Sequence, residues 1–448
     1  MALPIHTLPV LQNWDCHVCG TCCQEYQVTL SDEERRRIES QGWDRDADLG
    51  GLAPFVRRGW LSNLLRLPGL VLQLFLALFA LRRARSLWDQ TYRLNHRADG
   101  SCVFLSDKGR CRIHERHGYE AKPLPCRLFP FVLVPTGDHW SVGVRFACPS
   151  ASANKGRPLP EHGADLAVFA ARLAEREGLK TQPDGSLTAP PFLQGSQRLD
   201  WPDTLRIVQS LVAMLRDRRD PMERRLRKCL TLAKEMRRAK LKDITGVRLG
   251  ELLDVLRGVA DAETPAAATE RRPGWVGRIL FRQAAALFTR KDHGPNRGPA
   301  ARGRLALLAA AWRFTRGTGR VPRMHRLIPE ATFAQAEEPL GPLPVEAEQL
   351  LERYYALKVG ALQFCGAASF GLPLWEGLEA LAITYPVLMW ASRLHRDRPR
   401  DEALMEVLTI VDDHVGFNRV LASARQRLGF QILSRTGQLT RLIAWYGR

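Results

Sequence analysis

The sequence predicts a mainly α-helical protein, in which a small cysteine-rich α+β module is followed by a large all-α helical domain. Eight of the ten cysteines lie in the first third of the chain, together with short alternating segments typical of strands. Beyond about residue 160, Ala, Leu and Arg recur at helical spacing between loops rich in Pro and Gly. We therefore place the module at 1–155 and the helical domain at 156–448, with room for two sub-bundles divided near 317–345.

Composition narrows the class of protein but not its function. The 448 residues are 45% apolar and 25% charged, an ordinary mix for a folded chain of two or three domains. The formal net charge of +19 would attract nucleic acid, anionic lipid or an acidic protein, although an Arg-rich genome gives the same surplus. No zinc finger, RNP aromatic motif or helix-turn-helix pattern indicates specific nucleic-acid recognition.

Two segments bear on whether the protein is secreted, cytoplasmic or bound to a membrane. Met1 to Trp14 lacks the basic stretch, apolar run and cleavage site of a secretory signal, so we expect a cytoplasmic protein with reduced cysteines. Leu67 to Leu81 is uncharged and flanked by arginines, but its fifteen residues are fewer than the roughly 20 that cross a bilayer. We interpret it as a buried or interfacial helix within a hydrophobic insertion at about 50–90, with membrane-surface contact through 60–85 as the alternative.

Local signals outline the secondary structure of the module. The alternation over Tyr26–Leu30 predicts a short strand, and Ser31 followed by Glu34 forms a capping box that predicts the start of a helix. Two hairpins are also predicted, one pairing Cys102–Leu105 with Arg110–Ile113 and the other pairing Phe131–Val134 with Trp140–Phe146.

Helical spacing outlines the second domain. The expected helices are 163–178, 203–219, 221–242, 276–290, 302–316, 346–364, 373–395, 401–414 and, with a break, 418–446. Residues 258–275 are among the expected loops. Residues 216–242 hold twelve basic and four acidic residues around an apolar stripe. This basic amphipathic helix either faces the core with its charges solvated or meets an acidic partner, RNA or a membrane surface.

The spacing of the cysteines points to a metal site. Cys16, Cys19 and Cys22 follow the C-x2-C-x2-C pattern, in which short loops let three thiolates hold one iron-sulfur cluster, and Gly20 permits the tight turn between the last two. Cys126, preceded by Pro125, and Cys148, followed by Pro149, are both candidates for a fourth ligand.

Eight cysteines are enough for two four-cysteine sites. Successive side chains are expected to point apart, so Cys22 and Cys23 should serve different sites, and a second zinc or iron site could use Cys102 and Cys111. A purely structural zinc module is the alternative to the cluster. His114 and His117 could add imidazole ligands, whereas His17 should point away from the cysteine run. Cys229 and Cys365 are expected to be core residues.

Four motifs carry a family resemblance, and they are Cys16-x2-Cys19-x2-Cys22-Cys23, Cys102-Val-Phe-Leu, Cys111-Arg-Ile-His114 and Pro125-Cys126-Arg127-Leu-Phe-Pro130. Together they resemble the CxxCxxCC cysteine-cluster family, the YkgJ-like proteins. That family is regarded as a zinc- or iron-chelating domain and includes flagellin lysine-N-methylases. The resemblance covers roughly 14–32 and 100–149. It implies metal ligation by Cys16, Cys19, Cys22, Cys23, Cys102, Cys111 and Cys126.

Two features depart from the family pattern. Lys122-Pro123 stands where the family often has Arg-Pro, and the hydrophobic insertion at 50–90 is unusually long. Neither departure removes a cysteine, so the expectation of metal binding is kept while the substrate is left open.

We therefore expect Cys148 and the seven cysteines implied by the resemblance to bind an iron-sulfur cluster of 4Fe-4S type, zinc, or both. The role would be redox chemistry or protein modification. The resemblance specifically allows protein lysine N-methylation with S-adenosylmethionine, although no P-loop, dinucleotide fingerprint or radical C-x3-C-x2-C spacing is present. The opposing hypothesis is a non-catalytic, zinc-stabilised interaction protein.

An enzyme would need a cleft beside the module and a protein substrate. The polar residues expected at such a cleft lie on the late helices, and they are Tyr354, Tyr355, His395, Asp412, Asp413 and His414.

Overall fold

The computed structural model describes residues 3–7, 12–57, 92–239, 241, 244–292, 294–421 and 423–448. Over these residues the protein is mainly α-helical with small sheets, which confirms the predicted fold class. The chain forms two compact units. The cysteine unit comprises Val18–Phe129 and His293–Pro295, and the helical unit comprises Met1–His17, Pro130–Asp292 and Asn296–Arg448. These units are groups of residues that pack together and are not continuous stretches of the chain. They therefore do not test the predicted domain boundary at 155, which stays a prediction.

The segment Leu67–Leu81 and most of the predicted insertion lie outside the described residues. Within the ranges that the structure does describe, no helix has the length and apolar character that a membrane crossing requires.

The cysteine unit combines short helices with one small sheet. Its helices are α1 (Thr21–Glu25), α2 (Asp32–Glu39), α3 (Arg45–Leu49), α6 (Arg112–His117) and α7 (Leu124–Leu128). The sheet has the antiparallel order β3 (Thr29–Leu30), β5 (Tyr92–Leu94), β4 (Phe55–Arg57).

The ends of the undescribed segment 58–91 lie next to each other. Arg57 and Tyr92 are paired across β4 and β5, so the chain leaves and re-enters the sheet at one place. A long insertion can therefore be accommodated there without separating the cysteine segments on either side of it.

The core of the cysteine unit is small and includes cysteines. Buried Leu30, Ile38, Leu94, Phe104 and Ile113 pack with Cys102, and Cys23, Cys111 and Cys126 pack against this cluster. The predicted capping box is present at α2, because the Ser31 side chain accepts from the Glu34 N–H and the Glu34 carboxylate accepts from the Ser31 N–H.

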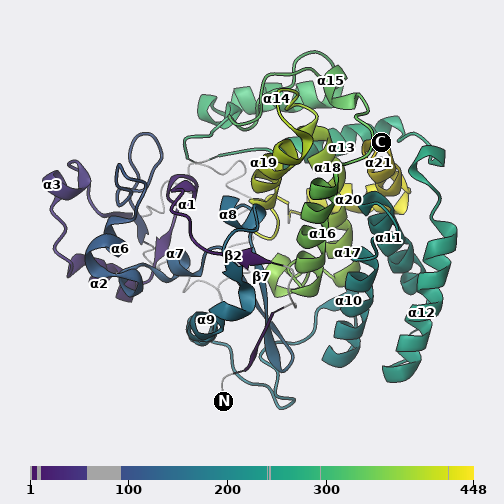
Figure 1. The fold of residues 1–448 in the computed structure, drawn as a ribbon, viewed down its shortest axis with the longest axis horizontal. Helices are drawn as coiled ribbons and strands as arrows, with labels where there is room; N and C mark the ends of the chain where they lie inside the picture. Colours follow the sequence, from purple (N-terminus) through teal and green to yellow (C-terminus); the bar gives the residue numbers. More distant parts are fainter. Residues whose placement is uncertain are drawn as a thin grey trace, which may run out of the picture. The chain divides into compact units, whose positions relative to one another are not determined.

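The helical unit is a helical assembly with a three-stranded sheet and two short ribbons (Figure 1). Its strands are β1 (Ile5–Thr7), β2 (Asn13–Trp14), β6 (Phe131–Thr136), β7 (His139–Val144), β8 (Arg157–Pro158), β9 (Phe192–Gln194) and β10 (Gln197–Arg198). The main sheet has the order β1-β7-β6, with β1 parallel and β6 antiparallel to β7. The β6–β7 hairpin confirms the second predicted hairpin.

Its helices run through the rest of the chain. They are α8 (Pro149–Ser152), α9 (Gly163–Glu177), α10 (Trp201–Leu215), α11 (Met222–Arg238), α12 (Gly246–Glu263), α13 (Trp275–Phe288), α14 (Arg304–Arg316), α15 (Phe333–Glu337), α16 (Val345–Gly360), α17 (Leu374–Ala382), α18 (Thr384–Ser392), α19 (Arg400–Asp412), α20 (Ala424–Arg435) and α21 (Gln438–Tyr446). Short 3-10 turns occur at Tyr119–Ala121, Leu159–His162, Ala267–Thr269, Pro299–Arg302 and Ala367–Ser369.

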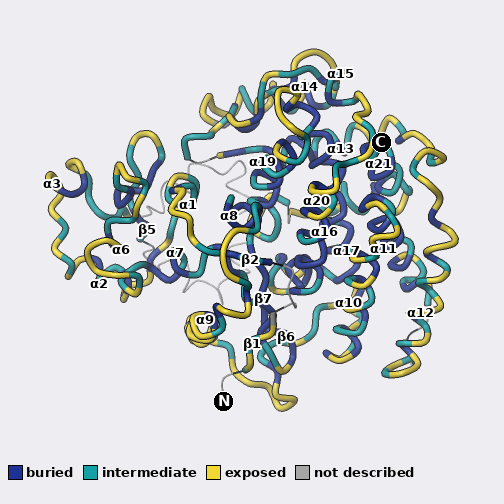
Figure 2. The backbone as a smooth tube through the Cα atoms, in the orientation of Figure 1, coloured by how far each residue is buried: buried dark blue, intermediate teal, exposed yellow. Residues whose placement is uncertain are grey.

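Helices α11, α16 and α18 form much of the core of the helical unit, whereas α9 and α12 each keep one face in solvent (Figure 2). The predicted apolar stripe on α11, which includes Leu226, Cys229 and Met236, is buried. Many of its basic side chains are paired with carboxylates inside the unit. Arg225 pairs with Glu352 at 3.1 Å.

Three local predictions were wrong. Residues 102–113 form only an isolated bridge between Leu105 and Cys111, because Arg112 onward is helical rather than extended. Residues 246–263 form a helix that was not predicted, and its last part lies in an expected loop. The expected helix 373–395 is two helices that meet at Ile383.

Candidate metal centre

The first cysteine segment is shaped by a tight turn and a short helix. Gly20 has a left-handed backbone with φ of 70° and caps α1, as its position between Cys19 and Cys22 predicted. Cys22 and Cys23 lie in α1, whereas Cys19 precedes the turn and is exposed.

The second cysteine segment folds back onto the first. The Cys102 N–H donates to the Cys23 carbonyl at 2.8 Å, although the two residues are far apart in the sequence. Cys111 caps the start of α6, and Cys126 lies within α7. The prediction that the two cysteine segments meet in space is therefore confirmed for these residues.

The thiols of Cys22, Cys102, Cys111 and Cys126 lie near one another. Burial, together with the neighbouring thiols of Cys111 and Cys22, raises the pKa of Cys102 to about 12. Burial also raises the pKa of Cys126 well above its usual range, and Cys102, Cys111 and Cys22 add to this effect. Raised pKa values favour the neutral thiols of Cys102 and Cys126, and a bound metal ion would supply the positive charge that favours their thiolates.

Lys122 provides a positive charge beside this group. It lowers the pKa values of Cys22 and Cys126 and so opposes the effect of burial. Its position, two residues before the start of α7, is where the sequence has Lys-Pro in place of the more usual Arg-Pro. A lysine at this place retains the charge that favours ionised thiols.

The cysteine of α7 is held in place by the capping box of α2. The Glu34 carboxylate, which accepts from the Ser31 N–H, also accepts from the Leu124 N–H at 2.5 Å with its other oxygen. Leu124 is the first residue of α7, so one buried side chain fixes both helix starts.

The expectation that Cys22 and Cys23 point apart was wrong. Both lie in α1, where successive side chains diverge by about 100° rather than to opposite faces. A hydrogen bond with Cys23 is the largest cause that raises the pKa of Cys22. Both thiols can therefore belong to one group.

The two nearby histidines take part in aromatic packing. His117 packs edge-on against Trp43, with ring centroids 5.5 Å apart, and His114 packs against Tyr119 at 5.8 Å. Burial lowers the pKa of His114.

The chemistry of these donors fits a thiophilic metal. All ten cysteines are free thiols, so none of the eight clustered in the first third of the chain is consumed in a disulfide. Within the described residues, no three Cys, His, Asp or Glu side chains lie in an arrangement that could hold a metal ion. Metal binding would therefore require the thiols to move closer together, as expected where binding is coupled to folding.

Residues 15–149 match the CxxCxxCC family model. The description of that model is "Putative zinc- or iron-chelating domain". The match confirms the resemblance seen in the cysteine motifs and assigns a metal-chelating cysteine cluster to this part of the chain. No curated protein and no solved structure matches the chain significantly.

The CxxCxxCC match also includes Cys16 and Cys148, which lie in the helical unit. Cys148 is buried and caps the start of α8, and Pro149 is the first residue of that helix. Cys16 is exposed. The neighbouring His17 ring lies 3.2 Å from the Ser150 hydroxyl and contacts the Asp15 carbonyl. That this ring points away from the cysteine run stays a prediction.

A buried ionic network holds the segment that carries Cys148. The Ala147 N–H donates to Asp412 at 3.1 Å, and the other Asp412 oxygen lies 2.7 Å from the Lys358 ammonium. Lys358 and Asp412 are 1% and 0% exposed, so this ion pair is fully withdrawn from water. Two residues before Ala147, Arg145 pairs with Asp413 at 2.7 Å. The end of the CxxCxxCC match is therefore fixed to α16 and α19.

The polar residues of the late helices are parts of the core in the described structure. Tyr354 lies beside Asp412, and burial raises its pKa, while the Tyr355 hydroxyl lies 2.9 Å from that of Thr384. Burial alone would raise the pKa of Asp413, but Lys291 and Arg145 hold it below its usual range. Burial lowers the pKa of His414 to about 4 and also lowers that of His395.

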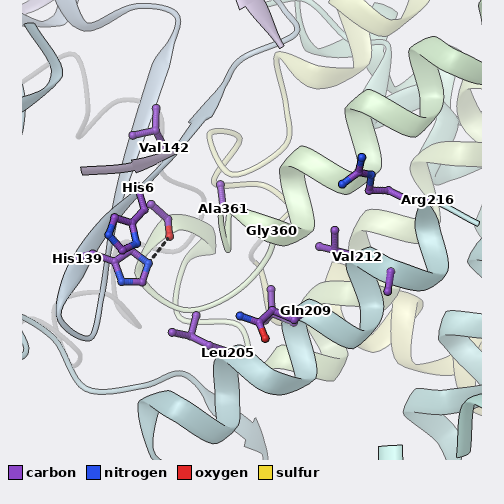
Figure 3. A pocket seen from close by; sticks show the side chains of 12 residues that line it. His6, His139, Val142, Leu205, Gln209, Val212, Arg216, Gly360 and Ala361 are labelled. Atoms are coloured by element: carbon purple, nitrogen blue, oxygen red, sulfur yellow. Dashed lines mark hydrogen bonds between the residues drawn. The ribbon is translucent and has the colours of Figure 1, made fainter. Parts of the chain in front are cut away.

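The helical unit also has a cavity of about 650 Å³ that sequence reasoning did not anticipate. Figure 3 shows the His6 and His139 rings stacked at its edge. Their centroids are 4.1 Å apart, and the His139 Nε2 lies 3.3 Å from the Ser141 hydroxyl. Apolar side chains from α10 line much of the remainder. A cavity with apolar walls and few polar groups suits a small ligand. Only the parallel pairing of β1 with β7 brings His6 to His139, and no local sequence signal could reveal it.

Proposed function

We propose that the CxxCxxCC module binds an iron-sulfur cluster of 4Fe-4S type. The observation that carries this proposal is the meeting of Cys22, Cys102, Cys111 and Cys126, from segments far apart in the chain, beside the positive charge of Lys122. Cys19 and Cys23, which lie in the same unit, belong to the proposed ligand set, while Cys16 and Cys148 of the helical unit stay candidates from the sequence.

Iron is preferred to zinc because of the number and spacing of the thiols. A structural zinc ion needs four ligands, whereas the cysteine unit alone contains six cysteines. The C-x2-C-x2-C run is typical of iron-sulfur proteins. An iron-sulfur cluster would supply one-electron transfer, and the protein's part would be to hold the thiolates, bury them and offset their charge with Lys122.

Anaerobic purification with metal and acid-labile sulfide analysis tests the proposal. The protein is expected to be brown, to contain iron and sulfide, and to show broad visible absorbance from sulfur-to-iron charge transfer. Stoichiometric zinc without iron would contradict the cluster and leave the zinc-stabilised interaction protein as the better account.

Redox chemistry is the role that this cluster would support directly. Protein lysine N-methylation with S-adenosylmethionine rests on the family resemblance alone, since none of the six polar residues expected at a cleft lines the cavities of about 650 and 700 Å³. The proposal is therefore confined to metal binding and redox chemistry.

A further inference from the structure

Helix α14 is apolar on both its inner and its outer side. On the inner side, Phe314 is 1% exposed and packs edge-on against Phe333, with ring centroids 5.4 Å apart. On the outer side, Leu305, Leu308 and Trp312 are 82%, 67% and 63% exposed. Their spacing of three and then four residues places them on one helix face. Large apolar side chains on a helix are normally covered, yet within the described residues the outer apolar side chains of α14 stay exposed.

The segment around α14 carries an unusual excess of positive charge. Residues 293–329 contain eight arginines and no aspartate or glutamate. Arg302, Arg313 and Arg316 are exposed, and none of them pairs with a carboxylate within the described part of the chain. The outer surface of α14 is therefore a short apolar stripe flanked by unpaired guanidinium groups at the edge of the helical unit (Figure 1).

We propose that the outer face of α14 binds the surface of an anionic lipid membrane. Leucine and tryptophan side chains enter the boundary between headgroups and acyl chains, and arginines bind the lipid phosphates. Tryptophan in particular favours this boundary, because its ring is apolar and its N–H is polar. Nucleic acid would match the arginines but not the apolar stripe. This surface differs from the segment 60–85 and from α11, and it lies outside the metal-binding module, so it goes beyond the proposed function.

Vesicle flotation of the full-length, anaerobically purified protein tests the inference. The wild type should float with vesicles of phosphatidylcholine and phosphatidylglycerol but remain at the bottom with pure phosphatidylcholine. Exchange of Leu308 and Trp312 for Gln should lower the partition coefficient roughly tenfold or more, because their apolar contact is lost. Exchange of Arg313 and Arg316 for Gln should lower it roughly fivefold per arginine.

The matched control exchanges Val247 and Val255 of α12 for Gln. These residues are 75% and 64% exposed, so the control also removes exposed apolar side chains from a surface helix. It should float like the wild type. The inference is overturned if the wild type does not float with anionic vesicles, if it floats equally with neutral ones, or if the α14 variants partition as the control does. Unchanged circular dichroism shows that the variants are folded.

Discussion

Replacing Asp412 with Ala is expected to lower the free energy of unfolding by about 3–5 kcal/mol, because it leaves the Lys358 ammonium buried without a counter-ion. The same change removes the acceptor of the Ala147 N–H beside Cys148. Burial already lowers the pKa of Lys358, while Asp412 opposes that effect, so loss of the carboxylate favours the neutral amine. Chemical denaturation at neutral pH measures the change.

Two variants separate the buried charge from general damage to α19. Glu402→Ala alters an exposed carboxylate in the first turn of the same helix and should change the unfolding free energy by about 0.5 kcal/mol or less. The double variant Lys358→Met with Asp412→Asn should recover most of the loss, since it removes both charges and keeps an acceptor for Ala147. A double variant as unstable as Asp412→Ala would show that the ion pair is not the cause.

Cys126→Ser is expected to cause the largest loss of metal among single changes. The thiols of Cys22, Cys102 and Cys111 lie near enough to raise the pKa of Cys126, and a serine hydroxyl is a poor substitute for a thiolate ligand. Metal affinity should fall roughly tenfold or more, and competition with a chelator measures it.

Cys229→Ser is the matched control for that variant. Cys229 is fully buried in the helical unit, so this change also introduces a hydroxyl into a core, but it is not among the proposed ligands. It should keep the wild-type metal content. Equal loss of metal from both variants would attribute the effect to unfolding and not to ligation.

Elements whose signals lie within a few residues could be predicted from the sequence. The capping box of Ser31 and Glu34 begins α2 because both of its hydrogen bonds are local. The turn at Gly137 joins β6 to β7 because that glycine has φ of 68°, and the helix predicted at 163–178 ends at Gly178 with φ of 64°.

Elements decided by packing were predicted less well. Helix α12 contains Gly258, where a loop was expected to begin, yet Leu249, Leu253 and Ala260 are buried and tertiary contacts preserve the helix. Cys111 begins a helix whose first residues, Arg112 and Ile113, imitate the alternation of a strand. In both cases the burial pattern, and not the local propensity, determines the structure.

The cysteine spacing identified the candidate ligands but not their neighbours. It could not show that Cys102 binds back to Cys23, or that Lys122 faces the thiols, because both depend on how distant segments pack. The sequence also could not show that Glu34 accepts a hydrogen bond at the start of α7. The capping box with Ser31 is a sufficient reason for a glutamate at this position, so nothing local pointed to a second role.

X-ray absorption at the edge of the bound metal is the most direct test of the central claim, that the gathered thiols form a metal centre. Spectra from anaerobically purified wild-type protein should show sulfur scatterers in the first shell of iron, together with a short iron-to-iron path from the cluster. A first shell made of oxygen or nitrogen scatterers would contradict the account, because the metal would then be bound away from the cysteines.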